Sequence, residues 1–464
     1  MKPVLTAAQM RAADEAAMRT VSHRVLVERA GLATAIEATR LLDRVYGASV
    51  VVLAGPGANG EDGRVCARHL EARGARVAVL DATTSIERIC DADLVVDAAF
   101  GTGLSRRWDA PEIEGSPPVL AVDLPSGVDP DTGVAAGRSL RATRTLAMGA
   151  RKRGHLLADG AVLSGEVVVA DLGIPVVDAP VALVDDADLR WLPALGRDEH
   201  KWRRGLVIVA GSAGMLGAPG LASAGALAVQ AGMVLLCVPD VPRRREGPWG
   251  TEVVRLAAST PEIPEVVGAA LERARALVAG PGVGRAARTQ KSLADVLRAT
   301  REPVVLDADA LHLVDVETLR GRQERGGSPV VLTPHDGEYA ALFGAPPGSD
   351  RIDAAQDAAA RTGCTVLLKG PTTVIASTHV PPGVPATLVV TSGTPDLATP
   401  GSGDVLSGMV GGLLARGLPA HLAAALAAHV HGRAGASLGA RCRAGLLAEA
   451  VAAVLSRRGA TDAR

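Results

Sequence analysis

The chain has 464 residues, of which 48% are hydrophobic, and this length is typical of two or three compact domains with ample core. Its 49 basic and 50 acidic residues nearly cancel, and aromatic residues make up only 2%, which argues against nucleic acid and membrane surfaces as partners. Five scattered cysteines without a CxxC pair favour reduced thiols over disulfides or structural zinc. The N-terminal stretch MKPVLTAAQMRAADEAAMRT lacks the apolar core of a signal peptide, and no apolar run could span a bilayer, so we expect a cytoplasmic protein.

Short apolar, β-branched runs that end in Gly, Asp or His recur along the chain, each followed by a segment with helical spacing. Continuous apolar strands that alternate with helices indicate parallel sheets buried on both faces, so we expect an α/β protein. Ligands of such sheets bind at the carboxyl ends of the strands, where these Gly, Asp and His residues fall. The predicted strands lie within residues 49–55, 75–82, 92–103, 118–127, 205–214, 233–239, 276–284, 303–311, 329–338 and 365–373.

The first glycine-rich stretch, AGPGANGEDGRVCARHLEARG (54–74), follows a predicted strand and opens a predicted helix. Its glycines match the GxGxxG fingerprint of dinucleotide-binding folds, and Asp81 follows at a suitable distance, but a tight strand-to-helix turn also needs glycine for steric reasons alone. Asn59 and Asp62 add side-chain oxygens at the start of the helix. A negative aspartate there fits a site that also holds a cation, a ribose or an amide better than a site for pyrophosphate alone.

Two further predicted strands of the first half each end in an aspartate. Asp97 lies in VVDAAFGTGLSRR (95–107), and Asp123 lies in AVDLPSGVDPDTG (121–133). Aspartate often caps a loop without any other role. Two carboxylates at the ends of two buried strands instead favour proton transfer or the binding of a hard cation.

Together these motifs resemble the N-terminal domain of the NAD(P)H-hydrate repair proteins, the NAD(P)HX epimerases. The resemblance implies a Rossmann-like three-layer domain over residues 1–190, potassium held by Asn59, Asp97 and Ser126, and Asp123 as the catalytic acid/base. The implied substrate contacts come from two loops and from the catalytic aspartate: Ala58, Asn59, Gly60, Glu61, Asp62, Gly101, Thr102, Gly103, Leu104, Ser105, Arg106, Arg107 and Asp123.

Two positions of the first loop depart from the family pattern NNGGDG. Ala58 replaces an asparagine, and Glu61 replaces a glycine and adds bulk and charge where a pyrophosphate would pass. These changes leave open the alternative that the first domain is a nucleotide-binding module without catalysis. Restoring Asn and Gly should raise epimerase activity if this loop limits it.

The halves are separated by residues 169–205, which are rich in proline and aspartate and then turn basic. We place the linker at 191–199 and expect a second, larger α/β domain over 200–464. Its last segment is rich in alanine and leucine with helical spacing and predicts closing helices that pack on the second sheet.

The stretch GSGDVLSG (401–408) is the strongest candidate site of the second half. No GxxxxGK[ST] motif occurs in the chain, so a P-loop is excluded. Glycines at a helix N-terminus free backbone N–H groups and form an anion hole. Asp404, in the first turn, could take a proton from a hydroxyl as phosphate arrives, although an aspartate at this position also stabilises a helix through its dipole alone.

Other strand ends of the second half carry residues suited to a phosphorylated ligand. Lys369, one of only five lysines, follows a strand in LLKGPTT, where a mobile ammonium could meet phosphate. Ala218, in a glycine- and serine-rich turn, leaves room for a flat ligand, and GPGVG (280–284) is a close-approach turn. His335 follows a strand among polar residues, a position that favours ligand contact over a purely structural role.

This set resembles the ribokinase-like superfamily and, within it, the NAD(P)H-hydrate dehydratase domain. The matching stretches follow the family's order: HKWRRG (200–205), GSAGMLGAPGLAS (211–223), AGPGVG, LDADAL (306–311), TPHDGE (333–338), LLKGPTT and GSGDVLSG. The resemblance implies AMP/ADP contacts from Lys369, Gly370, Pro371, Thr372, Thr373 and Gly403. It implies contacts to the hydrated nicotinamide nucleotide from Ala218, Gly282, Gly284, His335 and Asp404.

The resemblance also implies the reaction and its co-substrates. Asp404 would deprotonate the ring hydroxyl of S-NAD(P)HX while ADP transfers its phosphoryl group, which yields NAD(P)H, AMP and phosphate. The two-domain order is bacterial and favours ADP over ATP, Mg²⁺ is implied by the phosphoryl transfer, and a homo-oligomer is expected. A ribokinase-like kinase of a small vitamin alcohol remains the alternative for this half, which the first domain and the HKxxxG opening disfavour.

Overall fold

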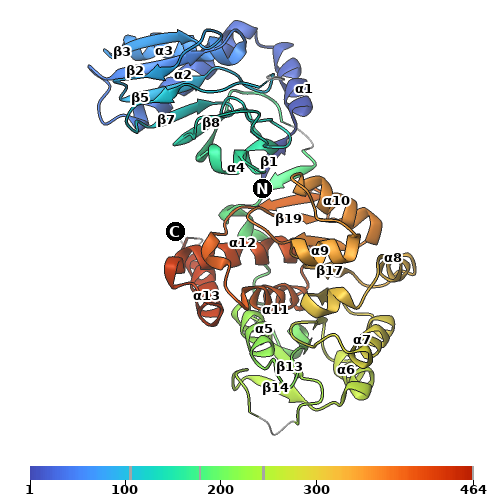
Figure 1. Cartoon of the computed structure of the whole chain (residues 1–464). Helices are drawn as coiled ribbons and strands as arrows, with labels where there is room; N and C mark the ends of the chain where they lie inside the picture. The colour runs from blue at the N-terminus through green and yellow to red at the C-terminus, as the bar shows by residue number, and fades with distance from the viewer. Residues whose placement is uncertain (104–106, 177–178, 243–245, 462–464) are drawn as a thin grey trace. The chain divides into compact units, whose positions relative to one another are not determined.

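The computed structural model describes residues 1–103, 107–176, 179–242 and 246–461. The chain divides into two compact units, which we call the amino-terminal unit (2–181) and the carboxyl-terminal unit (182–464, with Met1). Figure 1 shows the first in blue to green and the second in green to red. The predicted linker 191–199 belongs to the carboxyl-terminal unit. The boundaries expected for the two catalytic domains, 1–190 and 200–464, stay predictions.

The amino-terminal unit is built on a parallel six-stranded sheet with the order β10-β8-β7-β5-β2-β3. The four strands expected from the sequence are present, and β8 and β10 extend the sheet beyond them. The central strands β2, β5 and β7 are almost fully buried, as their continuous apolar runs predict. The strands are β2 (Ser49–Ala54), β3 (Arg76–Asp81), β5 (Leu94–Ala98), β7 (Val119–Val122), β8 (Arg144–Met148) and β10 (Glu166–Ala170).

Helices α2 (His23–Leu41) and α3 (Ala58–Glu71) cover one face of this sheet. They can approach closely because Gly31 has no side chain: a Cβ there would lie 2.3 Å from Val65. The segment with the short pair β4 (Arg88–Ile89) and β6 (Glu112–Ile113) covers the other face. The remaining elements are β1 (Lys2–Leu5), α1 (Ala7–Met18), β9 (Arg151–Lys152) and α4 (Gly160–Leu163).

The sheet of the carboxyl-terminal unit has the order β14-β13-β12-β15-β16-β17-β18-β19-β20-β11. From β14 to β18 neighbouring strands are parallel, and β18, β19 and β20 are antiparallel. The strands are β11 (Val181–Leu183), β12 (Gly205–Val209), β13 (Met233–Cys237), β14 (Val253–Leu256), β15 (Ala276–Ala279), β16 (Val304–Leu306), β17 (Val330–Leu332), β18 (Thr365–Leu368), β19 (Thr373–Ala376) and β20 (Thr387–Val390).

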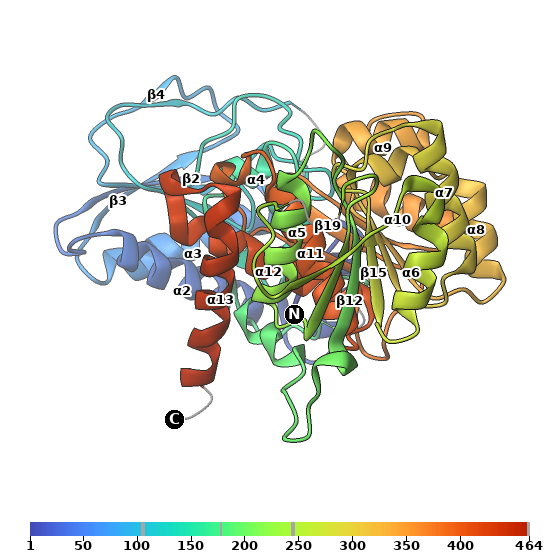
Figure 2. The ribbon, with the colours of Figure 1, turned by 90° about the horizontal axis from the view of Figure 1, so that it is seen from below.

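Helices lie on both sides of this sheet. Figure 2 shows α5, α11 and α12 on one side of β12 and β15, with α6, α7 and α10 on the other. The predicted closing helices are α12 and α13, and α12 packs on β19 and β20 as expected. The helices are α5 (Gly217–Ala228), α6 (Ile263–Leu271), α7 (Ala287–Ala299), α8 (Val316–Glu324), α9 (Asp336–Phe343), α10 (Arg351–Thr362), α11 (Ser402–Ala415), α12 (Ala420–Leu438) and α13 (Ala444–Thr461).

Among the described residues, the helices are all too short or too polar to pass through a membrane.

Candidate functional site

Asp404 lies in the first turn of α11, as the sequence predicts. The helix begins directly after Gly401, whose φ of 87° is in the left-handed region that favours glycine. A Cβ on Gly401 would lie 2.3 Å from Leu221, so the start of α11 and α5 approach closely. Burial raises the pKa of Asp404 to about 7, and the negative charges of Asp307 and Glu338 act in the same direction. This carboxyl group therefore exchanges its proton near neutral pH, as a general base needs.

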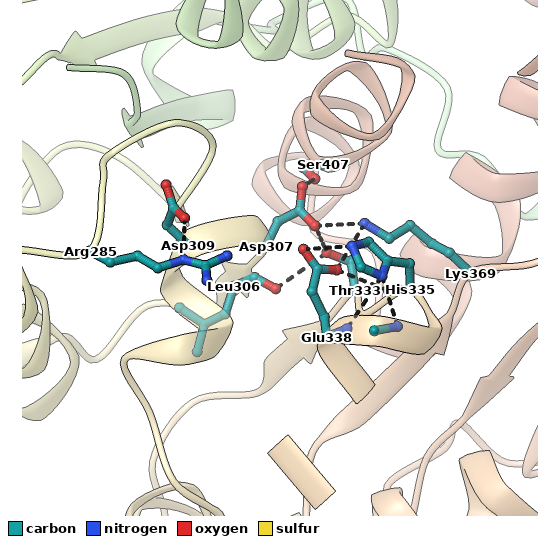
Figure 3. Close-up of polar contacts among 10 residues, drawn as sticks. Arg285, Leu306, Asp307, Asp309, Thr333, His335, Glu338, Lys369 and Ser407 are labelled. Carbon is teal, nitrogen blue, oxygen red and sulfur yellow. Dashed lines mark hydrogen bonds and ion pairs between the residues drawn. The ribbon is translucent and has the colours of Figure 1, made fainter. Parts of the chain in front are cut away.

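Asp404 has a partly buried ion pair near it, formed by Lys369 and Asp307. Figure 3 shows this pair. Lys369 Nζ donates to Asp307 Oδ1 at 2.9 Å and lies 3.6 Å from Glu338 Oε2. Asp307 also accepts hydrogen bonds from the hydroxyls of Thr333 at 2.7 Å and Ser407 at 2.5 Å. Burial opposes the charge of Lys369, but these two acids outweigh it and raise its pKa. A fixed cation is thus available beside the free N–H groups of α11.

The ion pair follows from the register of the sheet. Leu306 of β16 pairs with Leu332 of β17, so the next residues, Asp307 and Thr333, lie side by side at the carboxyl ends. Asp307 is fully buried, and although burial would raise its pKa, Lys369 and the hydroxyl donors hold it below its ordinary value. The carboxylate therefore stays ionised and keeps Lys369 in place.

His335 caps α9 with Nδ1, and its other ring nitrogen, Nε2, lies 3.5 Å from Glu338 Oε1. Its Nδ1 accepts the backbone N–H groups of Gly337 and Glu338 at 3.0 and 3.3 Å, while Glu338 Oε2 accepts the N–H of His335 at 2.9 Å. An accepting Nδ1 leaves the proton on Nε2 in the neutral ring. The side chain is 59% exposed, so this Nε2–H can donate to a ligand.

The predicted nucleotide-binding residues Lys369–Thr373 form the turn between β18 and β19. Arg351 at the start of α10 holds it by donating to the carbonyls of Lys369 at 2.6 Å and Thr372 at 3.3 Å. A Cβ on Gly370 would lie 2.4 Å from this guanidinium, so glycine permits the contact, and Pro371 is exposed at the tip of the turn. Gly403 faces the same place, since a Cβ there would lie 3.5 Å from Lys369 Nζ.

The two other glycine-rich turns of this unit pack against each other. A Cβ on Gly282, whose φ is 65°, would lie 3.2 Å from the Cβ of Ala218. The N–H of Gly211 donates to Pro281 O at 2.7 Å, and the N–H of Gly284 donates to Asp309 at 2.9 Å. The structure therefore brings Ala218, Gly282 and Gly284 together, one turn of α5 away from the start of α11.

The described residues form no group of three or more His, Cys, Asp or Glu side chains suited to a metal ion. Mg²⁺ commonly uses one or two carboxylates together with substrate phosphates. Three acids lie near Lys369, and of these Asp307 accepts hydrogen bonds from two hydroxyls. The other two, Glu338 and Asp404, suit a metal ion that arrives with a nucleotide. The donor set thus fits Mg²⁺ carried by phosphates.

In the amino-terminal unit, Asp123 is clamped at the end of β7. Its φ of 67° is rare outside glycine, and its Oδ1 accepts from the N–H of Met148 at 3.0 Å and from Lys152 Nζ. Lys152 is fully buried, and its backbone N–H donates to His155 Nδ1 at 2.9 Å. His155 Nε2 therefore carries the proton and donates to Asp123 O at 2.7 Å. Burial lowers the pKa of His155 to about 4, which keeps the ring neutral.

A second carboxyl group, Asp62, lies near Asp123. Asn59 Nδ2 donates to Val122 O at 3.0 Å and so attaches the first turn of α3 to the end of β7. Burial raises the pKa of Asp62 to about 8, with the charges of Asp123, Glu61 and Asp14 adding to the effect. Asp62 is thus a protonated acid at neutral pH beside a carboxylate that a lysine holds.

The predicted potassium ligands come together around one turn. Ser126 donates to Asp97 from its hydroxyl at 2.6 Å and from its N–H at 2.9 Å, and its Oγ accepts the N–H of Phe100 at 2.8 Å. Asn59 Oδ1 lies 3.3 Å from the position of a Cβ on Gly101. Asp97 is fully buried and forms no ion pair with the described residues. The oxygens and the uncompensated carboxylate fit a monovalent cation.

The other residues of the predicted substrate loops lie in different surroundings. Gly60 packs so closely that a Cβ would lie 1.9 Å from Gly55 O, whereas the Glu61 carboxylate lies 3.9 Å from His23 Nδ1 and is half exposed. Arg107 lines a hollow of about 350 Å³ beside β2 and β3. Ala58 begins α3, and Thr102 and Gly103 are exposed or partly exposed. Leu104, Ser105 and Arg106 lie outside the described residues.

Sequence reasoning missed the residues that hold the candidate groups in place: Lys152, His155, Asp307, Glu338, Arg351 and Ser407. Asp307, Glu338 and Ser407 lie inside quoted motifs, so those motifs contained the signal. Lys152 carries no local signal, because its partner Asp123 lies 29 positions away in the sequence.

The comparisons with known proteins agree with this geometry. A family model described as NAD(P)H-hydrate dehydratase matches residues 206–457, and one described as YjeF-related protein N-terminus matches residues 23–91 and 81–154. The chain is 37% identical to the bifunctional NAD(P)H-hydrate repair enzyme Nnr of Mycobacterium tuberculosis H37Rv over 86% of either chain. It is 34% identical to the Nnr of Salinibacter ruber over 88% of this chain and 86% of the other. The chain belongs to the bifunctional NAD(P)H-hydrate repair enzymes.

A solved structure supports the fold of the repair enzyme's carboxyl-terminal unit. A ribokinase-like superfamily protein from Enterococcus faecalis aligns with a TM-score of 0.51 and 22% identity, covering 60% of this chain and 96% of that one. The expected α/β class, with a ribokinase-like second half, is confirmed. The dehydratase match includes Asp404 and Lys369, and the N-terminal match includes Asn59, Asp123 and Lys152.

Proposed function

We propose that this repair enzyme epimerises R- and S-NAD(P)HX in its amino-terminal unit and dehydrates S-NAD(P)HX in its carboxyl-terminal unit, converting ADP to AMP and phosphate. One observation carries the dehydratase assignment: Asp404, with a pKa raised to about 7, stands at a helix N-terminus beside the buried cation of Lys369. A base that works near neutral pH and an anion-binding helix end are the two parts that this phosphoryl transfer needs.

The proposed dehydration proceeds by phosphorylation and elimination. Asp404 takes the proton of the ring hydroxyl, and the hydroxyl oxygen attacks the terminal phosphorus of ADP, so the bond between that phosphorus and AMP breaks. The N–H groups of α11 and Lys369 hold the phosphoryl oxygens. The ring nitrogen lone pair then expels phosphate from the carbon, and the adjacent ring carbon loses a proton, which restores the double bond of NAD(P)H. Phosphorylation is needed because hydroxide leaves poorly.

The ligands are assigned to the residues around this centre. We place AMP/ADP against the turn Lys369–Thr373 and Gly403, which Arg351 positions. The hydrated nicotinamide nucleotide would contact Ala218, Gly282, Gly284 and the exposed ring of His335. Mg²⁺ bound with the phosphates, near Glu338 and Asp404, would neutralise charge on the transferred group.

The proposed epimerase site uses Asp123 as the acid/base. Lys152 Nζ donates to this carboxylate and orients it, and Asp62 offers a protonated acid close to it. Potassium at Asn59, Asp97 and Ser126 would compensate the buried Asp97, and the substrate would lie along residues 58–62 and 101–107. The Glu61 side chain is half exposed and lies near His23, which supports the proposal that the loop can still admit substrate.

We also propose a homo-oligomer that works in the cytoplasm, where the nicotinamide nucleotides are used. Light scattering on the purified chain tests the first part, and a mass equal to a single chain would contradict it. Fractionation of the source cells tests the second.

The direct test of the dehydratase uses purified S-NADHX with ADP, ATP or neither, and follows the absorbance of reduced nicotinamide. We expect recovery with ADP, loss of recovery in Asp404→Asn, and normal recovery in Asp357→Asn, an exposed acid on α10. A stable phosphoester in place of NADH would instead support a small-molecule kinase.

A further inference from the structure

A hollow of about 520 Å³ lies near the amino ends of β16 and β17, whereas Asp404 lies near their carboxyl ends. Residues 297–301, which precede β16, and residues 325–328, which precede β17, form much of its wall. Asp307 and Thr333 follow the carboxyl ends of the same strands, so the hollow and the ion pair lie at opposite strand ends. We call it the arginine cavity; α7 and α8, which end beside it, lie on the same side of the sheet (Figure 1, Figure 2).

Arginine is the only charged residue type in the lining of this cavity. Four arginines, Arg298, Arg301, Arg322 and Arg325, line it together with the hydroxyl-bearing Thr300, Thr318 and Ser328. Arg298 is paired with Asp295 of its own helix. The other three form no ion pair with any residue in the described parts of the chain. Three uncompensated guanidinium groups therefore share one wall.

Arg322 is the fixed member of this group. Its side chain is 92% buried, since the residue is only 8% exposed, and its Nη1 donates to the carbonyls of Leu297 and of Thr300, the latter at 2.8 Å. Its Nε has no hydrogen-bond partner in the described chain. Burial and the nearby Arg325 lower the pKa of Arg322. A buried cation without a carboxylate is costly, and an anion in the cavity would offset that cost.

Arg301 and Arg325 differ from Arg322 because their side chains are exposed. In the described parts of the chain, the guanidinium groups of Arg301 and Arg325 form no hydrogen bond to the backbone of α7 or α8, so they are free to turn towards a ligand. The cavity therefore has one fixed guanidinium group, that of Arg322, and two exposed ones that can adjust to a ligand.

We propose that the arginine cavity binds a small phosphorylated anion at a site separate from the proposed catalytic centre. Guanidinium groups pair with phosphate through two parallel hydrogen bonds, and hydroxyl groups supply further donors to a tetrahedral oxyanion. A volume of 520 Å³ falls within the range of roughly 300–1,000 Å³ that is typical of small-molecule sites. The cavity therefore has room for a phosphate with an organic group attached to it.

The test is calorimetric titration of the full chain with inorganic phosphate, inorganic pyrophosphate and ribose 5-phosphate. The variants are the double substitution Arg301→Ala with Arg325→Ala and the control Arg320→Ala, an exposed arginine of α8 that pairs with Glu324. We expect the double variant to bind at least one of these anions tenfold or more weakly than the wild type, and the control to bind like the wild type. Tighter binding of ribose 5-phosphate than of phosphate would assign the site to organic phosphates, and the reverse order would assign it to free phosphate.

Anion binding near Asp404 contributes equally to all these titrations, so the difference between variants reports on the arginine cavity. Unchanged affinity in the double variant, or equal weakening in Arg320→Ala, would overturn the proposal. Normal NADH recovery by the double variant shows that it is folded. As a second measurement, crystals soaked in pyrophosphate should show density between Arg301 and Arg325, and an empty cavity beside an occupied catalytic centre would also overturn it.

Discussion

Asp404 is partly buried and Asp123 is buried, and their surroundings suit them to different roles. Asp404 is surrounded by other acids, and burial and these charges raise its pKa to about 7 despite the nearby Lys369. Asp123 instead lies against the buried Lys152, and a left-handed backbone conformation fixes its direction. Asp404 can therefore act as a base near neutral pH, whereas the carboxylate of Asp123 is held in one orientation.

The pKa of Asp404 predicts a pH profile. A base with a pKa near 7 is protonated below that value, so dehydratase kcat/KM should rise between about pH 6 and about pH 8 and then level off. Asp404→Asn should lower kcat by roughly 10²–10⁴-fold and abolish the rise. Steady-state kinetics across this pH range test both statements. If the residual activity of Asp404→Asn showed the same pH profile as the wild type, Asp404 would not be the base.

The same carboxyl group predicts an effect on stability. The unfolded carboxyl loses its proton at its ordinary pKa, whereas the folded one keeps it up to about 7, so this group lowers stability as pH rises between the two values. Asn has no such charge. The Tm of Asp404→Asn relative to the wild type should therefore increase from about pH 5 to about pH 8. An unchanged difference across this range would show that the folded pKa is not raised.

Lys152 should be required by the first activity alone. Lys152→Met leaves the Asp123 carboxylate without its buried partner, a change that typically costs about 3–5 kcal/mol. Epimerisation of R-NADHX should fall by at least about tenfold if the unit remains folded, while dehydration of S-NADHX continues. Lys291→Met, at an exposed lysine of α7, is the control for loss of a lysine. Equal epimerase rates in the two variants would remove Lys152 from the site.

At the scale of elements, the candidate dehydratase site is assembled by neighbouring strand ends. Asp307, Thr333 and Lys369 follow β16, β17 and β18, which are adjacent and parallel, so their side chains converge. The N-terminus of α11 lies beside them and adds Asp404. Loops and helix starts thus carry the chemistry, while the buried strands hold the spacing.

Two glycines that flank α11, one before its start and one after its end, offer a matched pair of substitutions. Gly401 and Gly417 have φ angles of 87° and 86°, but a Cβ on Gly401 meets Leu221 at 2.3 Å, whereas nothing lies within 4 Å of one on Gly417. Both changes to Ala should cost about 1–2 kcal/mol of backbone strain. Only Gly401→Ala should also displace the start of α11 and reduce dehydratase kcat. Thermal unfolding and kinetics separate the two effects, and equal kcat values would contradict them.

The sequence predicts those parts of the fold that depend on residues close together in the chain. Ten apolar runs each contain a strand of the structure, and Asp404 falls at a helix start because glycines and an apolar run enclose it. Strand β8 was not expected, since RTLAM has few β-branched residues. The pairing of Lys152 with Asp123 joins residues 29 positions apart, and that of Lys369 with Asp307 joins residues 62 apart. Only the folded sheet brings such partners together.

At the scale of the whole molecule, the two units each have a core of their own and together fit a repair enzyme that handles both epimers. The core of the carboxyl-terminal unit includes Ala182, Val184, Leu189 and Leu192, which precede the predicted start of the second catalytic domain at residue 200. The segment before residue 200 is therefore part of that core.

This packing predicts how the second unit can be isolated. A chain of residues 182–464 should unfold at a higher temperature than one of residues 200–464, because burying each large apolar side chain contributes about 1.5–3 kcal/mol. Calorimetry on the two chains measures the difference. Equal Tm values would show that the catalytic limit at 200 is also the limit of the folded unit.

One measurement tests both proposed activities together: the recovery of NADH from purified R-NADHX by the full chain with ADP. Because only the S epimer is dehydrated, we expect recovery by the wild type, none by Asp404→Asn, and recovery only at the spontaneous epimerisation rate by Asp123→Asn. With S-NADHX the Asp123→Asn variant should act like the wild type. Failure of the wild type to return NADH from either epimer would contradict the account.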